Sequence, residues 1–169
     1  RSTLFPYTTL FRSPYSIDCI AVAQALHWFD LARFYAEVRR IAKPGAVIAA
    51  WTYDVLHVGD AAIDGIVQEF YEGTLGKYWP AERRHVERRY ADLPFPFDQV
   101  TPPPLEMYVS WSLPHLIGMF ASWSAVGRYR KATGNDPLPA VTQALAARWG
   151  DPATERRIAW GLWMRAGRV

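Results

Sequence analysis

The sequence predicts an α/β fold built on a parallel sheet, because its first third contains a strand–helix–strand pattern. Residues 17–23 and 46–51 are two short, almost continuously apolar runs, typical of strands that are covered on both faces. Between them, from Leu31 to Ile41, apolar residues recur at steps of three and four, as on one face of a helix. Two strands joined by a helix form a βαβ unit, whose crossover is almost always right-handed.

Sequence signals mark both ends of this first helix. Asp30 is a good N-cap candidate because its carboxylate can accept hydrogen bonds from the first turn. Pro44 and Gly45 are expected to end the helix and to lead into the second strand.

The rest of the chain predicts a helical cap and two further strands. Helical spacing predicts helices over residues 61–71, 114–130 and 138–149. The proline-rich stretch 94–104 predicts a long irregular connection, since proline lacks a backbone donor. Alternation over 106–113 predicts a strand with one exposed face, and residues 157–165 are expected to form the last strand.

Composition narrows the class of protein. A chain of 169 residues, half of them hydrophobic, can bury one core, and a net charge of only +3 gives no reason to expect a nucleic-acid partner. The single cysteine, Cys19, excludes an intrachain disulfide, and no apolar run approaches the roughly 20 residues that span a bilayer. We therefore expect a cytoplasmic protein without a membrane partner. Aromatic residues make up 15% of the chain, so we expect some rings to line a pocket for a small molecule.

The first thirteen residues, Arg1–Ser13, match no structural pattern. They show neither strand alternation nor a helical stripe, and they lack the charged start of a signal peptide. The run from Thr3 to Ser13 resembles the translation of a sequencing-adapter oligonucleotide, so we interpret it as a non-native tail; a genuine flexible tail is the alternative. A non-native tail joined to a core strand would mean that upstream sequence is missing before Pro14.

From Pro14 to Val169 the sequence resembles class I S-adenosylmethionine-dependent methyltransferases, in the branch described as methyltransferase type 11 and trans-aconitate methyltransferase-like. The resemblance rests on an aromatic residue, Trp51, near the end of the second strand and on an ordered series of motifs. These motifs are AQALHWFD, KPG, YWPAERR, LPFPF, WSAVGRYRKATG and RIAWGLWMRAGRV.

This resemblance implies a partial Rossmann-like sheet of mixed direction, made of the family's strands four to seven, with helices and a helical cap. The first three strands are expected to be missing, together with the Gly-rich turn that admits the cofactor, since no GxGxG occurs in the chain. The resemblance thus implies methyl transfer from S-adenosylmethionine to a small-molecule acceptor in the intact protein, and an inactive isolated chain. An alternative is a non-catalytic, aromatic-lined module that binds a small molecule.

The resemblance also implies positions for the binding sites. Ligands of open α/β sheets lie beyond the carboxyl ends of the strands. The residues after the first strand are expected to flank the cofactor: Ala23, Gln24, His27 and Trp28. Read without the resemblance, His27 would rather be a hydrogen-bonded core histidine. Trp51 and Tyr53, after the second strand, are expected to face the substrate, although aromatic residues at strand ends often serve packing alone.

The cap is expected to complete the substrate site with aromatic side chains and an arginine. The aromatic candidates are Trp79, Trp111, Trp123 and Tyr129, of which some could instead be core. Four arginines alternate with Glu82 and Glu87, which favours a solvated helix face with local ion pairs: Arg83, Arg84, Arg88 and Arg89. The alternative is that one of them, for which we choose Arg83, clamps a substrate carboxylate, as a substrate of the trans-aconitate type would require. The four histidines have no metal-like spacing, so no metal site is expected, and no catalytic base can be assigned.

Overall fold

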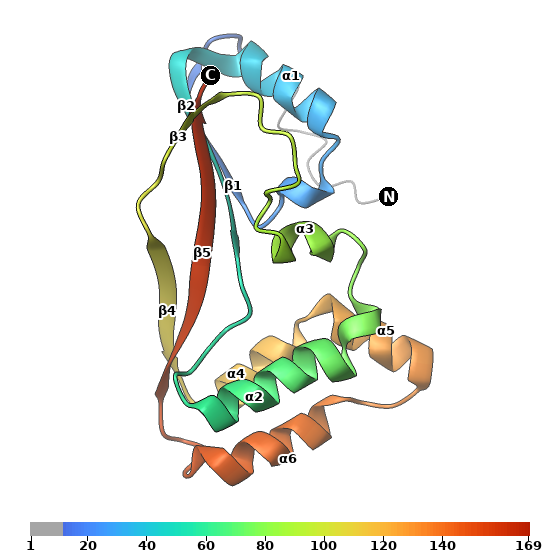
Figure 1. The fold of residues 1–169 in the computed structure, drawn as a ribbon. Helices are drawn as coiled ribbons and strands as arrows, with labels where there is room; N and C mark the ends of the chain where they lie inside the picture. Colours follow the sequence, from blue (N-terminus) through green and yellow to red (C-terminus); the bar gives the residue numbers. More distant parts are fainter. Residues whose placement is uncertain (1–11) are drawn as a thin grey trace. The chain divides into compact units, whose positions relative to one another are not determined.

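The computed structural model describes residues 12–169, which form two compact units (Figure 1). Unit 1 comprises the chain up to Tyr53 together with Arg84–Pro104 and Trp163–Val169. Unit 2 comprises Asp54–Arg83 and Leu105–Leu162. Apart from Arg12 and Ser13, the predicted non-native tail at residues 1–13 lies outside the described residues. Each unit combines segments that are far apart in the sequence.

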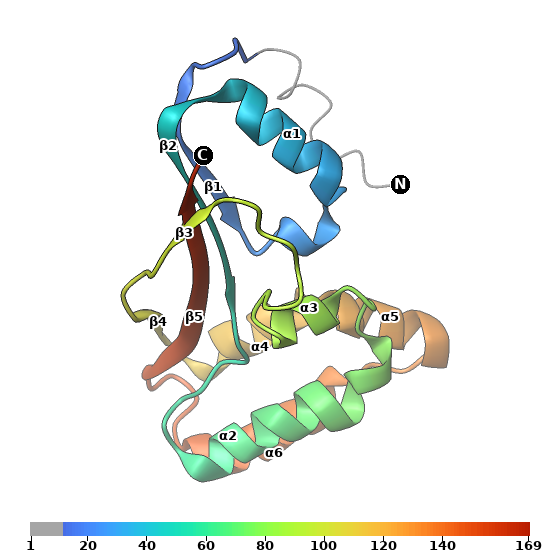
Figure 2. The ribbon, with the colours of Figure 1, turned by 45° about the horizontal axis from the view of Figure 1, so that its top comes forward.

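Unit 1 contains the predicted βαβ unit. Strand β1 (Ile17–Ala23) pairs in parallel with β2 (Ala42–Tyr53), and helix α1 (Leu31–Ile41) connects them (Figure 2). Asp30 caps α1 as predicted, because its carboxylate accepts a hydrogen bond of 3.2 Å from the backbone nitrogen of Arg33.

The end of α1 differs slightly from the prediction. The helix stops at Ile41, and β2 already begins at Ala42, so Pro44 and Gly45 lie inside the strand. Gly45 adopts a φ of 78°, which only glycine reaches without strain. The pairing of β1 with β2 is irregular in this region, between Ile17 and Cys19 of β1, before it becomes regular.

Strand β1 is less covered than the sequence suggests. Of its seven residues only Val22 is buried, while Cys19 and Ala21 are exposed. Among the described residues β1 pairs with β2 alone, so its other edge is free. The expectation that both faces of this strand are covered is therefore wrong for the described residues. Only the face that carries Val22 packs against a core.

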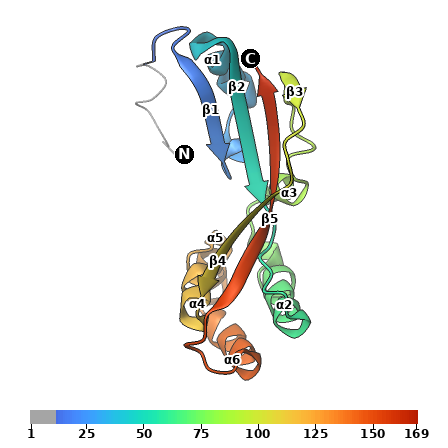
Figure 3. The same ribbon diagram turned by 90° about the vertical axis from the view of Figure 1, so that its left-hand side faces the viewer.

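The sheet has the order β1-β2-β5-β3, with β4 also paired to β5. Hydrogen bonds join Gly45 and Ala46 to Val169, and Asp54 to Gly161, so β2 and β5 (Arg156–Arg168) run in opposite directions (Figure 3). β3 (Asp98–Val100) and β4 (Leu105–Trp111) are likewise antiparallel to β5. The sheet is thus mixed, with β5 as the antiparallel strand. The short β3 was not predicted, because it lies inside the proline-rich stretch 94–104 and three residues are too few to show alternation.

Unit 2 contains the predicted cap helices with two changes of boundary. Its α-helices are α2 (Ala61–Gln68), α4 (Leu113–Ala121), α5 (Ser124–Thr133) and α6 (Leu138–Trp149). α6 has the predicted limits, and it packs beside α2 (Figures 1 and 2). α2 runs on into a π-helical turn, Glu69–Thr74, where the sequence predicts continuous helix to residue 71.

The predicted helix 114–130 is broken in two. Ser122 ends α4, and its hydroxyl donates a hydrogen bond of 2.6 Å to the carbonyl of Met119. Trp123 then takes an extended conformation and begins α5. A serine that bonds to a nearby carbonyl competes with the helical ladder, which explains the break.

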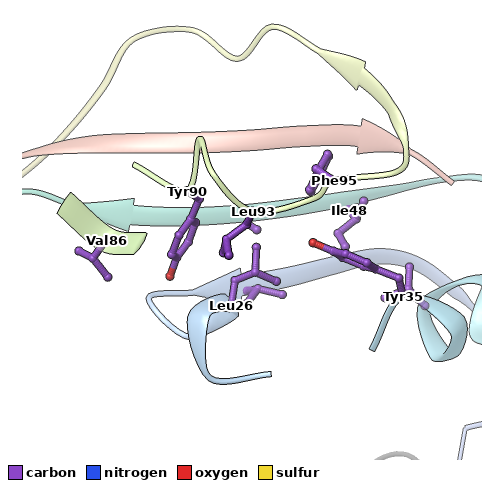
Figure 4. Packing of buried hydrophobic residues seen from close by; sticks show 10 residues of the cluster. Leu26, Tyr35, Ile48, Val86, Tyr90, Leu93 and Phe95 are labelled. Carbon is purple, nitrogen blue, oxygen red and sulfur yellow. The ribbon is translucent and has the colours of Figure 1, made fainter. Parts of the chain in front are cut away.

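The core of unit 1 lies between β1 and β2, α1 and the segment that contains helix α3 (Arg83–Glu87) (Figure 4). Leu26, Ile48 and Tyr90 are fully buried in it. Leu26 belongs to a 3₁₀ turn, Leu26–Trp28, and Tyr90 follows α3, so the core joins the loop after β1 to a segment about sixty residues later. No helix among residues 12–169 is long and apolar enough to cross a membrane.

Candidate functional site

The carboxyl ends of β1 and β2 lie side by side, as the sequence predicts. Ala23 pairs with Trp51, and the backbone nitrogen of Gln24 donates a hydrogen bond of 2.8 Å to the carbonyl of Trp51. Gln24 has a φ of 49°, in the left-handed region that is strained for residues other than glycine. Such strain is found where the surrounding structure holds a residue in place, and it is frequent at ligand sites.

The side chain of Gln24 ties the two strand ends together. Its Oε1 accepts a hydrogen bond of 2.6 Å from the hydroxyl of Thr52 and one of 3.1 Å from the backbone nitrogen of Tyr53. Because a backbone N–H can only donate, this contact fixes which end of the amide is oxygen. The Nε2 atom is buried and has no hydrogen-bond partner among the described residues. An unpaired buried donor is costly, and Nε2 therefore has unused hydrogen-bonding capacity.

His27 is anchored to the core of unit 1. Its Nδ1 lies 2.8 Å from the hydroxyl of Tyr90, and the two rings are in contact. Tyr90 is itself held by Arg165, whose guanidinium donates to the carbonyls of Tyr90 and Leu93. This is the geometry of a hydrogen-bonded core histidine. A role of His27 beside a cofactor stays a prediction. In this geometry His27 would position the loop after β1 rather than contact the cofactor.

Trp28 lies at an open groove of unit 1. It is 53% exposed and contacts the ring of His27. The groove has a volume of about 650 Å³ and runs between β1 and α1. Its apolar lining includes Ile17, Cys19, Ile20, Trp28, Phe34 and Ile41, and the charged residues Asp30, Arg33 and Glu37 also border it. The half-buried side chains of Trp51 and Tyr53 do not border this groove.

In unit 2, three of the predicted substrate residues come together. The rings of Trp79 and Trp123 are 5.5 Å apart, and both contact the buried ring of Tyr71, at 4.8 and 5.9 Å. The guanidinium of Arg83 lies 4.9 Å from the ring centre of Trp79 and 5.3 Å from that of Tyr71. We call Tyr71, Trp79, Arg83 and Trp123 the aromatic–arginine cluster.

Tyr71 fixes the position of Arg83 in this cluster. The Nε of Arg83 donates a hydrogen bond of 2.7 Å to the hydroxyl of Tyr71, while the carbonyl of Tyr71 accepts one of 3.1 Å from the indole of Trp79. Arg83 is half-buried, and no carboxylate among residues 12–169 lies within ion-pair distance of it. Arg83 therefore does not take part in the ion pairs predicted for this helix face, whereas Arg88 pairs with Asp92 at 3.5 Å.

The other two predicted substrate residues of unit 2 have different partners. Trp111, on β4, packs edge-on against Trp160 at 5.8 Å, and Tyr129, on α5, packs edge-on against Tyr78 at 4.9 Å. Neither ring contacts the aromatic–arginine cluster. A packing role also fits Trp123, because its ring contacts the buried rings of Phe70 and Phe120, at 6.1 and 4.6 Å.

Sequence reasoning missed three residues that shape these sites. Thr52 and Tyr90 are fully buried partners of Gln24 and His27, and Tyr71 holds Arg83. Thr52 could have been noticed as a polar residue beside Trp51, at the end of an apolar strand. Tyr90 and Tyr71 carry no local signal, because their partners lie 63 and 12 residues away.

The histidines other than His27 have local polar neighbours. His57 lies 3.7 Å from a carboxylate oxygen of Glu106, His85 lies 3.0 Å from Asp92, and His115 lies 2.9 Å from the hydroxyl of Ser112. In the part of the chain that the structure describes, no group of three or more His, Cys, Asp or Glu side chains could hold a metal ion.

Comparisons with known proteins give the chain two informative relatives. No family model matches it. It is 32% identical over 132 residues to a "putative methyltransferase" of Dictyostelium discoideum. The aligned region covers 77% of this chain and 50% of that protein. The structure of a "putative type II methyltransferase" from Anaeromyxobacter dehalogenans shares 48% identity and a TM-score of 0.85, over 92% of this chain and 66% of that one.

The chain therefore spans about half the length of the curated relative that it matches, and less than the full length of the structural neighbour. Identity of 48% with a TM-score of 0.85 indicates common descent as well as a common fold. The chain is thus similar in sequence to proteins described as putative methyltransferases, and it shares the fold of the aligned part of the Anaeromyxobacter structure.

Proposed function

We propose that this chain takes part in S-adenosylmethionine-dependent methyl transfer to a small molecule that carries a carboxylate, as in the type 11 and trans-aconitate methyltransferase-like branch. The observation that carries the proposal is the similarity to methyltransferases over most of the chain. The geometry supports two further assignments: cofactor-binding residues in unit 1 and acceptor-binding residues in unit 2.

The carboxyl end of β1 fits a cofactor that accepts hydrogen bonds. Ala23 is exposed there, and the unpaired Nε2 of Gln24 can donate to a carboxylate, a hydroxyl or a ring nitrogen, all of which S-adenosylmethionine carries. We assign Gln24 and Ala23 to the wall of the cofactor site, His27 to the positioning of the loop, and Trp28 to the exposed rim. S-adenosylmethionine, when bound, supplies an electrophilic methyl group on a sulfonium.

The aromatic–arginine cluster fits an anionic acceptor. Arg83 uses its Nε for Tyr71, and the same guanidinium retains its Nη donors for a planar carboxylate. Trp79 and Trp123 add apolar walls that would hold the acceptor and exclude water. A carboxylate is already ionised at neutral pH and needs no general base, which agrees with the lack of an assignable one. Trp51 and Tyr53 remain further candidates for acceptor contacts.

The free edge of β1 supports a proposal about the longer protein. Among residues 12–169 one edge of β1 is unpaired and lies beside an exposed apolar groove, which is unusual for a complete domain. We propose that the longer protein adds further strands at this edge, together with the Gly-rich turn of the cofactor site, and that the 169-residue chain alone does not transfer methyl groups. The genomic codons before Pro14 test this: a strand followed by a Gly-rich turn supports it. A native start codon there would favour the non-catalytic binding module.

The acceptor proposal is tested by methyl transfer with the protein expressed from its whole reading frame. Transfer of a labelled methyl group to trans-aconitate is compared for the wild type, Arg83→Gln and the neighbouring control Arg84→Gln. Because hydrogen bonds to a charged group contribute about 1.5–3 kcal/mol, we expect Arg83→Gln to lower kcat/KM for trans-aconitate about 10- to 100-fold, and Arg84→Gln to change it little. Transfer only to neutral alcohols or amines, or an equal loss in both variants, would contradict a carboxylate acceptor at Arg83.

A further inference from the structure

Strand β4 in unit 2 has one free edge. It pairs with β5 along its whole length, from Leu105 opposite Leu162 to Trp111 opposite Arg156. Among residues 12–169 no strand pairs with its other edge, and in Figure 1 β4 borders the sheet there. A free edge carries a row of backbone donors and acceptors that a further strand can bind.

The side chains of β4 favour association. Leu105, Met107 and Tyr108 are 40%, 37% and 63% exposed, which is unusual for three large apolar residues within four positions. Natural edge strands are normally protected by lysine, proline or a bulge. The prolines at 102–104 precede β4 rather than interrupt it, and its pairing with β5 shows no bulge.

The only charge on β4 is already balanced. Glu106 forms an ion pair of 2.5 Å with Arg157 on the neighbouring strand, and its other oxygen lies 3.7 Å from His57. Its carboxylate is thus drawn toward partners within unit 2. A charge that is paired inside the unit repels an incoming strand far less than a free one.

We propose that β4 is a dimerisation strand, on which β4 of a second copy of this chain pairs in antiparallel orientation about a twofold axis at Tyr108. In this register, residues of similar character in the two copies of β4 lie opposite each other. Met107 lies opposite the partner's Val109, Leu105 opposite the partner's Trp111, and Tyr108 opposite the partner's Tyr108. Apolar residues therefore meet on one face and two tyrosines on the other.

Charge selects this register and favours a second copy over an unrelated strand. At the Tyr108 axis, Glu106 lies opposite the partner's Ser110, so the two carboxylates do not face each other, and Arg157, which pairs with Glu106, lies over the Tyr108 ring at 4.6 Å. An axis at Glu106 would place the two carboxylates in direct opposition. A pairing over seven residues buries less than a standard interface, so the dimer is expected to form reversibly and in a concentration-dependent manner. Twofold self-pairing also closes the free edge, which protects it from open-ended growth.

The register is tested by disulfide trapping in the 169-residue chain with Cys19→Ser as the background. Tyr108→Cys places two thiols directly opposite each other, about 5 Å apart between Cα atoms, within disulfide range. Ser110→Cys is the matched control, because the two thiols would then lie about 13 Å apart along the strands. We expect intermolecular disulfide to form at least tenfold faster in Tyr108→Cys. Equal rates in the two variants would overturn the register.

Association itself is measured by sedimentation equilibrium over a range of concentrations. Met107→Lys adds a charge to the β4 edge and is expected to raise the dimer dissociation constant at least tenfold. Val100→Lys, on the exposed strand β3 of unit 1, is the matched control and is expected to leave the dissociation constant unchanged. Circular dichroism spectra that match the wild type show that both variants are folded. A monomer at all concentrations, or association that Met107→Lys does not weaken, would overturn the proposal.

Discussion

The bond between Thr52 and Gln24 provides a sharp test of how the ends of β1 and β2 are joined. Thr52→Val keeps the shape of the fully buried side chain but removes the hydroxyl that donates to Oε1 of Gln24 at 2.6 Å. Oε1 keeps its second donor, the backbone nitrogen of Tyr53 at 3.1 Å. The free energy of unfolding of the variant should therefore fall by about 1 kcal/mol, the net contribution of one hydrogen bond.

Removing the other partner should cost more. Gln24→Ala leaves two donors without an acceptor, the buried hydroxyl of Thr52 and the backbone nitrogen of Tyr53, so we expect a loss of about 2–3 kcal/mol. In the double variant the valine removes one of these unsatisfied donors. The combined loss should thus be smaller than the sum by about 1 kcal/mol or more.

Urea unfolding, followed by tryptophan fluorescence, measures this cycle. Thr101→Val serves as the control, because Thr101 is exposed and outside every strand and helix, and its replacement should change stability by less than about 0.5 kcal/mol. If the losses of Thr52→Val and Gln24→Ala simply add, the two side chains do not act as a unit, and the account of the joined strand ends is refuted.

Three further predictions concern the core of unit 1. Leu26→Ala should lower the free energy of unfolding by about 2–5 kcal/mol in urea titrations, because Leu26 is fully buried; a loss under about 1 kcal/mol would contradict the packing in Figure 4. Arg165→Lys should cost about 1–3 kcal/mol, since its guanidinium donates to two backbone carbonyls, whereas the exposed Arg168→Lys should cost little in the same assay. Burial raises the pKa of Tyr35 above its ordinary value of 10.0, although Arg165 opposes this rise. The neutral hydroxyl therefore stabilises the fold below pH 10, and this contribution disappears as the pH rises through the higher pKa of the folded state. Tyr35→Phe should be less stable than the wild type at pH 8, where its bond of 2.7 Å to the carbonyl of Pro94 is lost, and the difference should shrink or reverse by about pH 11; a constant difference would refute this assignment.

The sequence predicts those parts of the fold that follow from local patterns. The apolar runs and the amphipathic stretch predict β1, α1 and β2, Asp30 predicts the start of α1, and the limits of α6 are correct. The parallel pairing of two consecutive strands also predicts that Gln24 and Trp51 lie together. These predictions need only the period of the side chains and the handedness of one crossover.

What the sequence does not predict depends on tertiary contacts. The exposure of Cys19 depends on which strands lie beside β1, and the apolar composition of β1 alone suggests coverage on both faces. The partners of His27 and Arg83 come from distant segments, so their hydrogen bonds to Tyr90 and Tyr71 have no local signal. The break at Ser122 required the knowledge that its hydroxyl bonds back to the helix.

The most direct test of the account is calorimetric titration of S-adenosylhomocysteine into the protein from its whole reading frame, comparing the wild type with Gln24→Glu. A glutamate keeps the oxygen that accepts from Thr52 and Tyr53 but replaces the unpaired amide donor with an acceptor. We predict binding by the wild type, a dissociation constant at least tenfold higher for Gln24→Glu, and an unchanged affinity for the control Gln143→Glu, whose side chain is exposed on α6. No binding by the wild type, or equal affinities for wild type and Gln24→Glu, would contradict a cofactor site at the end of β1.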